Sequence, residues 1–211
     1  MTKVSKPVDS KVAEAYDQAA QALLAAAGQQ DEGALGHSER VTNYCLTVGK
    51  HLGMNHTDLT NLRHAASLHD IGKIGISRSI VNKLGSLTDE EFEIMRLHST
   101  LGIRILEKVE GLRGALPLVK HHHERWDGQG YPDKLAGDDI PLGARIIAVA
   151  ETYDILTSKV HWRRPMTVKH AATELRRCSG SQFDPKVVEA MIEAVIAEKA
   201  KDEEKAQSIA A

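Results

Sequence analysis

Histidines and carboxylates recur along the 211-residue sequence at an interval that could build a metal site. Counted between nearest members of the set, with adjacent residues taken together, the gaps are 32, 28, about 24 and 28 residues, each the length of one helix plus one loop. A helix bundle with this rhythm can bring one polar side chain per helix to a common point in its core. Imidazole and carboxylate together suit zinc, manganese, iron, nickel or cobalt better than calcium. The set comprises His37, His69, Asp70, His98, His121, His122, His123 and Glu151.

The adjacent pair His69-Asp70 favours a site with two metal ions. Neighbouring residues on a helix point about 100° apart, so these two side chains cannot easily chelate one ion symmetrically. They can serve one ion each, or hold one ion while the carboxylate reaches a second. Two-metal sites of this kind cleave phosphoesters. His122-His123 is a second such pair, and the alternative is that each histidine is separately a surface or core residue.

Helices must position these side chains. Capping residues and apolar residues at helical spacing recur from end to end, for example the capping box from Thr88 to Glu91 and Pro141 in a first helical turn. No run of alternating β-formers is present, so we predict an all-α fold of about eight or nine helices. The predicted helices cover 10–28, 38–52, 59–69, 88–97, 101–109, 112–124, 141–158, 167–180 and 185–197.

Composition excludes several classes of protein. Apolar residues make up 42% and charged residues 27%, which is typical of soluble globular chains. With 27 Lys and Arg against 29 Asp and Glu, the net charge is −2, so there is no basic excess to bind a nucleic-acid polymer. No apolar run approaches 18 residues, so no membrane span is expected. Two cysteines, Cys45 and Cys178, cannot form a disulfide framework, and a cytoplasmic location is predicted.

The length predicts one domain. We divide the chain into an N-terminal helix and loop (1–35), a histidine-bearing domain (36–197) and a charged C-terminal tail (198–211). The apolar face of the alanine-rich first helix could pack on the domain or pair with a second copy in a homodimer, and intramolecular packing is favoured. Whether the sequence is a full-length protein or an excised domain stays open.

A glycine-rich segment, Asp127-Gly-Gln-Gly-Tyr-Pro132, follows the histidine run within a few residues. Glycines allow backbone to approach a ligand closely, and the ring of Tyr131 could stack on a base. The alternative is a Gly/Pro turn with a half-buried tyrosine.

This segment, together with His69-Asp-Ile-Gly-Lys73 and His122-His-Glu-Arg125, resembles the signature of the HD-GYP family of cyclic di-GMP phosphodiesterases, within the HD phosphohydrolase superfamily. The three motifs occur in order and at family spacing, and the match runs from Gly36 to Pro185. The resemblance implies an HD-type helical bundle around a buried centre of two or three ions, often iron or manganese. It also implies hydrolysis of cyclic di-GMP to pGpG and then GMP by a metal-activated hydroxide.

The resemblance assigns roles residue by residue. Lys73 would lie beside the scissile phosphate and, with Asp70, form the catalytic pair. Tyr131 would lie near a guanine and Arg163 would hold a phosphate, whereas His121 would be an extra histidine outside the usual pair. The implied metal ligands are His37, His69, Asp70, His98, His122, His123 and, in place of the family's Asp, Glu151.

Three departures from the family pattern affect these expectations. Glu151 stands where the family has an Asp ligand and is one methylene longer. Asp154, on the same helix face, is a less favoured substitute for that ligand. Gly33 stands where some members have a Glu that supports a third metal, so two ions are expected. Val160 and Trp162 replace an Arg and a Tyr, which leaves substrate affinity and identity less secure than the metal site.

These departures keep two alternatives open beside the cyclic di-GMP phosphodiesterase. One is a degenerate binding or interaction module that retains metal and fold and signals through partner proteins. The other is an HD phosphohydrolase that acts on another nucleotide or cyclic dinucleotide. The sequence gives neither the metal identity nor the oligomeric state.

Overall fold

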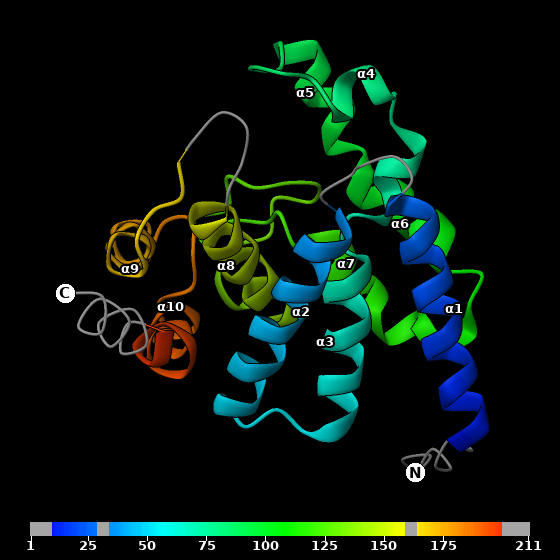
Figure 1. Cartoon of the computed structure of the whole chain (residues 1–211), viewed down its shortest axis with the longest axis horizontal. Helices are drawn as coiled ribbons and strands as arrows, with labels where there is room; N and C mark the ends of the chain where they lie inside the picture. The colour runs from blue at the N-terminus through cyan, green and yellow to red at the C-terminus, as the bar shows by residue number, and fades with distance from the viewer. Residues whose placement is uncertain (1–9, 29–33, 159–163, 200–211) are drawn as a thin grey trace, which may run out of the picture.

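The structure is a computed structural model that describes residues 10–28, 34–158 and 164–199. All regular elements in this part of the chain are helices, and the predicted all-α fold is confirmed (Figure 1). Its one extended pairing is an isolated bridge between Ser179 and Phe183. The α-helices are α1 (Ser10–Gly28), α2 (Ala34–His51), α3 (His56–Leu68), α4 (Arg78–Val81), α5 (Asp89–Arg96), α6 (His98–Leu106), α7 (Leu116–His121), α8 (Leu142–Thr157), α9 (Val168–Arg177) and α10 (Pro185–Met191). Short helical turns complete the described fold: η1 (Ile71–Gly75), η2 (Glu110–Ala115), η3 (Gly137–Asp139) and the π-helical η4 (Ile192–Ile196).

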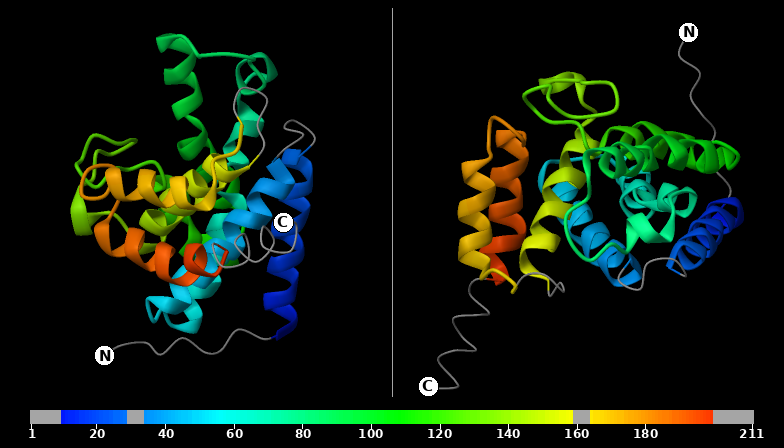
Figure 2. Two further views of the ribbon diagram at one scale, coloured as in Figure 1. Left: turned by 60° about the vertical axis from the view of Figure 1, so that its left-hand side comes forward. Right: turned by 90° about the horizontal axis from the view of Figure 1, so that it is seen from above.

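The helices form a bundle with one projecting arm. α2 and α3 pack as an antiparallel hairpin, α8 packs beside α2, and α7 packs against both α3 and α8. α1 covers α3 on one side, while α9 and α10 cover α8 on the other (Figure 2). The segment with α4 and α5 extends beyond the bundle at the end where α6 begins (Figure 1).

α8 is the central helix of the bundle. It is apolar on almost every side, as expected for a helix surrounded by other helices. Its buried residues are Gly143, Ala144, Ile146, Ile147, Val149, Ala150, Tyr153 and Asp154. A buried carboxylate near the end of such a helix needs a charged or hydrogen-bonded partner, and Asp154 therefore marks a polar region inside the bundle.

Most predicted helix starts agree with the structure. The Thr88 side chain and Glu91 form both halves of the predicted capping box. Pro141 immediately precedes α8, and the Asp184 side chain caps α10. The prediction of one helix over 112–124 is wrong at its start, because η2 occupies the glycine-rich stretch to Ala115. The single turn α4 was also not predicted, since one turn is too short to show a helical period.

A glycine in η1 allows the segment after α3 to lie directly against the start of α6. A Cβ at Gly72 would lie 1.9 Å from the carbonyl oxygen of His98 and 2.6 Å from the backbone nitrogen of Gly102. Both neighbours are backbone atoms, which cannot rotate away. Only glycine permits this approach, and it brings Asp70 beside His98.

We therefore predict that Gly72→Ala lowers the free energy of unfolding by about 1–3 kcal/mol or more, because the overlap must push α6 away from η1. Thermal or denaturant unfolding measures this change. Gly75→Ala is the matched control in the same turn, since its Cβ would meet only the side chain of Leu101, at 3.0 Å. Equal stability of the two variants would contradict the proposed close approach.

Candidate metal centre

Two groups of three potential metal ligands lie where helices meet. The first group is His37 from α2 with His69 and Asp70 from the end of α3; the second is His98 from the start of α6 with His122 and His123 from the end of α7. Within each group one nitrogen or oxygen atom per residue lies within 4.8 Å of the others.

The two groups adjoin, so they form one continuous site. Asp70 Oδ2 lies 3.4 Å from His69 Nε2, and Asp70 Oδ1 lies 3.6 Å from His98 Nε2 in the other group. The ring centroids of His69 and His122 are 5.2 Å apart. Asp70 therefore offers one carboxylate oxygen to each group.

Backbone carbonyls fix the tautomer of three of these histidines. In each case Nδ1 donates a hydrogen bond to the carbonyl oxygen three residues earlier: His69 to Ala66 at 2.8 Å, His98 to Met95 at 2.7 Å and His122 to Val119 at 2.6 Å. Because a carbonyl can only accept, Nδ1 carries the hydrogen. The Nε2 of each neutral ring then presents a lone pair.

These lone pairs face one another in a buried space. His98 Nε2 and His122 Nε2 are 3.3 Å apart. Burial lowers the pKa of both rings, and for His122 the neighbouring His123 lowers it further, so a proton is not expected between them. His69 Nε2 and Asp70 Oδ1 are also buried and have no hydrogen-bond partner among the described residues. This donor set fits bound cations, which would satisfy every one of these atoms.

Charges around the site keep Asp70 ionised. Burial alone would raise the pKa of Asp70, but Lys73 and the surrounding histidines outweigh it and hold the pKa well below its usual range. Lys73 Nζ donates to Asp70 Oδ2 at 2.7 Å. Burial raises the pKa of Glu151; His69 opposes this shift and Asp70 adds to it. Glu151 also lines a pocket of about 220 Å³ together with His122 and His123.

The tyrosine of the glycine-rich segment lies against the second group. The Tyr131 ring stacks on His123 with centroids 4.9 Å apart and planes at 29°. The Tyr131 backbone N–H donates to the His123 carbonyl at 3.2 Å. Gly130 makes this possible, because a Cβ there would lie 2.4–2.6 Å from backbone atoms of Arg125, Glu124 and His123.

The extra histidine of the run lies outside the two ligand groups. His121 uses both ring nitrogens elsewhere: Nδ1 donates to the Pro117 carbonyl, and Nε2 lies 3.0 Å from Asp133 Oδ2. The predicted phosphate ligand Arg163, and the departures at Gly33, Val160 and Trp162, lie outside the described residues.

A family model described as "HD domain" matches residues 21–187. The chain belongs to the HD domain family. Its predicted membership of the HD-GYP proteins is confirmed as well, because curated cyclic di-GMP phosphodiesterases are among the relatives of this HD domain.

Two relatives illustrate the similarity. A cyclic di-GMP phosphodiesterase of Thermotoga maritima is 41% identical over 158 residues, which cover 74% of this chain and 43% of the relative. The 3′3′-cGAMP-specific phosphodiesterase 2 of Vibrio cholerae is 37% identical over 159 residues, which cover 74% of this chain and 30% of the relative. The chain therefore spans less than half the length of these curated relatives.

A solved structure supports the fold. The HD domain of the phosphodiesterase PgpH of L. monocytogenes, in complex with cyclic-di-AMP, superposes with a TM-score of 0.61 and 16% sequence identity. The match covers 83% of this chain and 94% of the PgpH domain. At this identity the likeness establishes that both chains share the HD fold.

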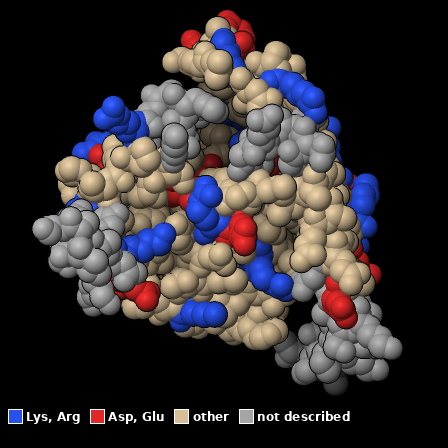
Figure 3. Space-filling view, viewed as in Figure 1, with Lys and Arg blue, Asp and Glu red and all other residues tan. Residues whose placement is uncertain are grey.

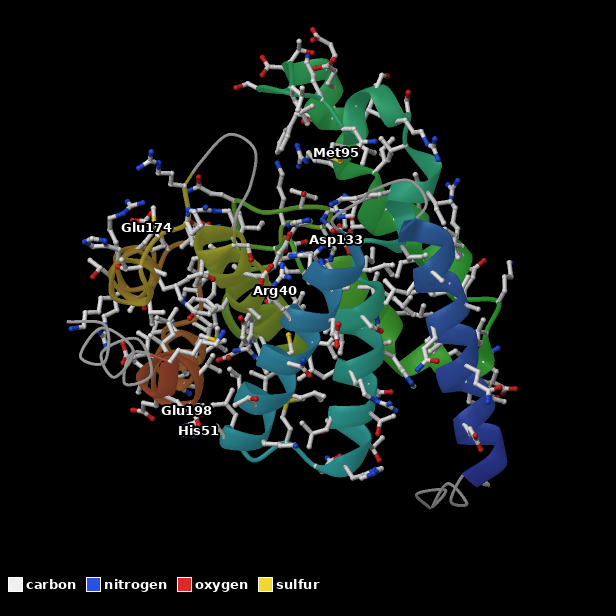
Figure 4. The ribbon with its side chains drawn as sticks, in the orientation of Figure 1. Arg40, His51, Met95, Asp133, Glu174 and Glu198 are labelled. Carbon is white, nitrogen blue, oxygen red and sulfur yellow. The ribbon has the colours of Figure 1, made fainter. Side chains whose placement is uncertain are left out.

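One candidate ligand, His37, is oriented by side chains instead of backbone. Its Nδ1 donates to Asp154 Oδ2 at 2.8 Å, and Asp154 accepts two further hydrogen bonds from Arg40, at 2.7 and 2.9 Å. The Asp154 side chain is 1% exposed. Asp154 is thus occupied by His37 and Arg40, which disfavours the substitute-ligand role weighed from sequence. Arg40 (labelled in Figure 4) was not identified from sequence, although it lies three residues after His37.

We predict that Asp154→Asn weakens metal binding by about 10- to 100-fold, because loss of this carboxylate frees the His37 ring and leaves the Arg40 charge without its partner. Titration of the apoprotein with Mn²⁺, followed calorimetrically, measures the change. Asp133→Asn is the control, since it removes a carboxylate that contacts a histidine outside the ligand groups, His121. The orienting role is refuted if both variants bind Mn²⁺ as the wild type does.

Proposed function

We propose that this HD domain is a metal-dependent phosphodiesterase that hydrolyses cyclic di-GMP to pGpG or GMP. The observation that carries the proposal is the set of buried imidazole Nε2 atoms that lie beside Asp70, in rings whose Nδ1 atoms donate to backbone carbonyls. The names of the relatives, cyclic di-GMP and 3′3′-cGAMP phosphodiesterases, support the substrate class.

The metal complement in this proposal is two ions, iron or manganese, without a third. Two adjoining groups of three ligands support two ions, and a mixed histidine and carboxylate donor set suits these metals. His37, His69 and Asp70 would hold one ion, and His98, His122 and His123 the other, with Glu151 as a further carboxylate ligand. When bound, such ions lower the pKa of water and neutralise charge on phosphoryl oxygens.

The protein's own groups would position and neutralise the substrate. Lys73 places an ammonium group beside Asp70, at the surface of the site, with its side chain 27% exposed. From there it would pair with a phosphoryl oxygen and stabilise the charge that develops during cleavage. Asp70 belongs to the first ligand group and lies 3.6 Å from His98 of the second, so its carboxylate stands between the two groups. Arg163 is proposed as a second phosphate contact.

The surface favours a small anionic substrate over a nucleic-acid polymer. On the face shown in Figure 3, basic and acidic side chains are interspersed, in keeping with the net charge of −2. A polymer-binding protein needs a basic stripe along which phosphates can lie. No described helix is long and apolar enough to cross a membrane.

The test is a hydrolysis assay on cyclic di-GMP combined with elemental analysis of the purified protein. Wild type is expected to contain about two transition-metal ions per chain and to release pGpG or GMP. His122→Ala should lose metal and turnover, because His122 belongs to the buried group, whereas His121→Ala should lose neither. Metal-loaded wild type that cleaves no nucleotide would favour the binding-module alternative. Cleavage of another nucleotide, without cleavage of cyclic di-GMP, would favour an HD phosphohydrolase with a different substrate.

Glu151 gives a second prediction. We expect Glu151→Gln to lose one metal ion or most of the rate, because the amide removes the negative charge, and Glu151→Asp to retain or raise activity. The longer Glu side chain costs well under about 2 kcal/mol in rotamer entropy relative to Asp. Metal content and initial rates measure both effects. A Glu151→Gln enzyme with full metal and full rate would remove Glu151 from the ligand set.

A further inference from the structure

The last turn of α5 carries an arginine that is tied to the metal centre. Arg96 precedes the metal-ligand candidate His98 by two residues. The carbonyl of Met95 (labelled in Figure 4) accepts the hydrogen bond from His98 Nδ1 at 2.7 Å. One short stretch of backbone therefore both orients His98 and places Arg96, so the position of Arg96 relative to the site is well defined.

A row of planar side chains leads from the second ligand group to the projecting arm. Tyr131 stacks on His123, and the guanidinium carbon of Arg96 lies 4.7 Å from the centre of the Tyr131 ring. The same carbon lies 6.0 Å from the centre of the Phe92 ring. Because an imidazole and a guanidinium already contact Tyr131, this ring is better suited to support Arg96 than to stack on a base itself.

The hydrogen-bonding fork of Arg96 is largely available. Among the described residues it has one hydrogen-bond acceptor, Glu93 Oε1, at 2.6 Å from Nη1. The Glu93 side chain is 66% exposed, and a surface ion pair of this kind is weak. Phe92, on the same helix, is 47% exposed, which leaves part of its ring open to solvent.

We propose that Arg96 selects guanine in the substrate by binding its O6 and N7 atoms, with the base stacked on Phe92. Guanine presents two acceptors on this edge, which match the guanidinium fork. Adenine presents N7 and an amino group, and the amino group cannot accept a hydrogen bond from arginine. This inference rests on the proposed function and deepens it, because it predicts preference for guanine-containing cyclic dinucleotides over cyclic di-AMP.

The experiment compares kcat and KM for cyclic di-GMP and cyclic di-AMP in wild type, Arg96→Gln and Arg96→Lys. Arg96→Gln should lower kcat/KM for cyclic di-GMP by about 10-fold or more, mainly through KM, and leave kcat/KM for cyclic di-AMP unchanged or raised, because glutamine can pair with N6 and N7 of adenine. Arg96→Lys should retain part of the activity on cyclic di-GMP, because an ammonium group can donate to O6 and N7 but lacks the rigid fork. Elemental analysis should show wild-type metal content in both variants. Arg104→Gln, at an exposed position on α6, is the matched control and should behave as wild type.

Two results would overturn the inference. An equal loss on both substrates would show that Arg96 binds phosphate and does not read the base, and a full rate of Arg96→Gln on cyclic di-GMP would show that it does neither. If metal-loaded wild type cleaves neither substrate, the proposed function fails, and calorimetric binding of the same two nucleotides then decides the inference. In that case a preference for cyclic di-GMP that Arg96→Gln abolishes supports it, and the absence of such a preference refutes it.

Discussion

The main constraint on this structure comes from buried imidazole rings whose Nδ1–H groups are bonded to backbone carbonyls, so that no ring can donate a hydrogen bond to the Nε2 of its neighbour. His69, His98 and His122 each donate Nδ1–H to a backbone carbonyl, which leaves the Nε2 of each ring with a lone pair inside the site. In a low-dielectric interior such lone pairs repel and lack the hydrogen bonds that water would give them. A cation removes both costs. The donor atoms inside the bundle are thus suited to a bound cation.

The helices meet this constraint by ending at the site. α3 and α7 end beside it and α6 begins there, so that His69, His98 and His122 lie at helix termini where the backbone can turn. Two close backbone approaches, at Gly72 and Gly130, then bring the segments within reach of one another. The apolar α8 passes through the middle and contributes Glu151 and Asp154, one to the pocket and the other to the support of His37.

Local and periodic features were accessible from the sequence. The capping box at Thr88, the apolar spacing of α2 and the histidine rhythm all arise from short-range geometry, and they predicted the fold and the two ligand groups. The pairing of His37 with Asp154 spans 117 residues, and the contact of Arg96 with Tyr131 joins an arm to a loop. Such contacts depend on how helices pack, which periodicity does not encode. Arg40 and Arg96 were therefore not recognised as residues of the site. The break between η2 and α7 was missed for a different reason, because glycine weakens a helix without always ending it.

The contrast between His37 and the other histidines has a consequence for how the site can change. Three rings are held by main-chain carbonyls, which no substitution removes, whereas His37 is held by the side chains of Asp154 and Arg40. The His37 ring can therefore be reoriented by substitution of Asp154 or Arg40, whereas reorienting the three backbone-held rings requires their helix ends to move. Within one scaffold, evolution can therefore adjust the orientation of one candidate ligand and leave the backbone-held rings as a fixed structural reference.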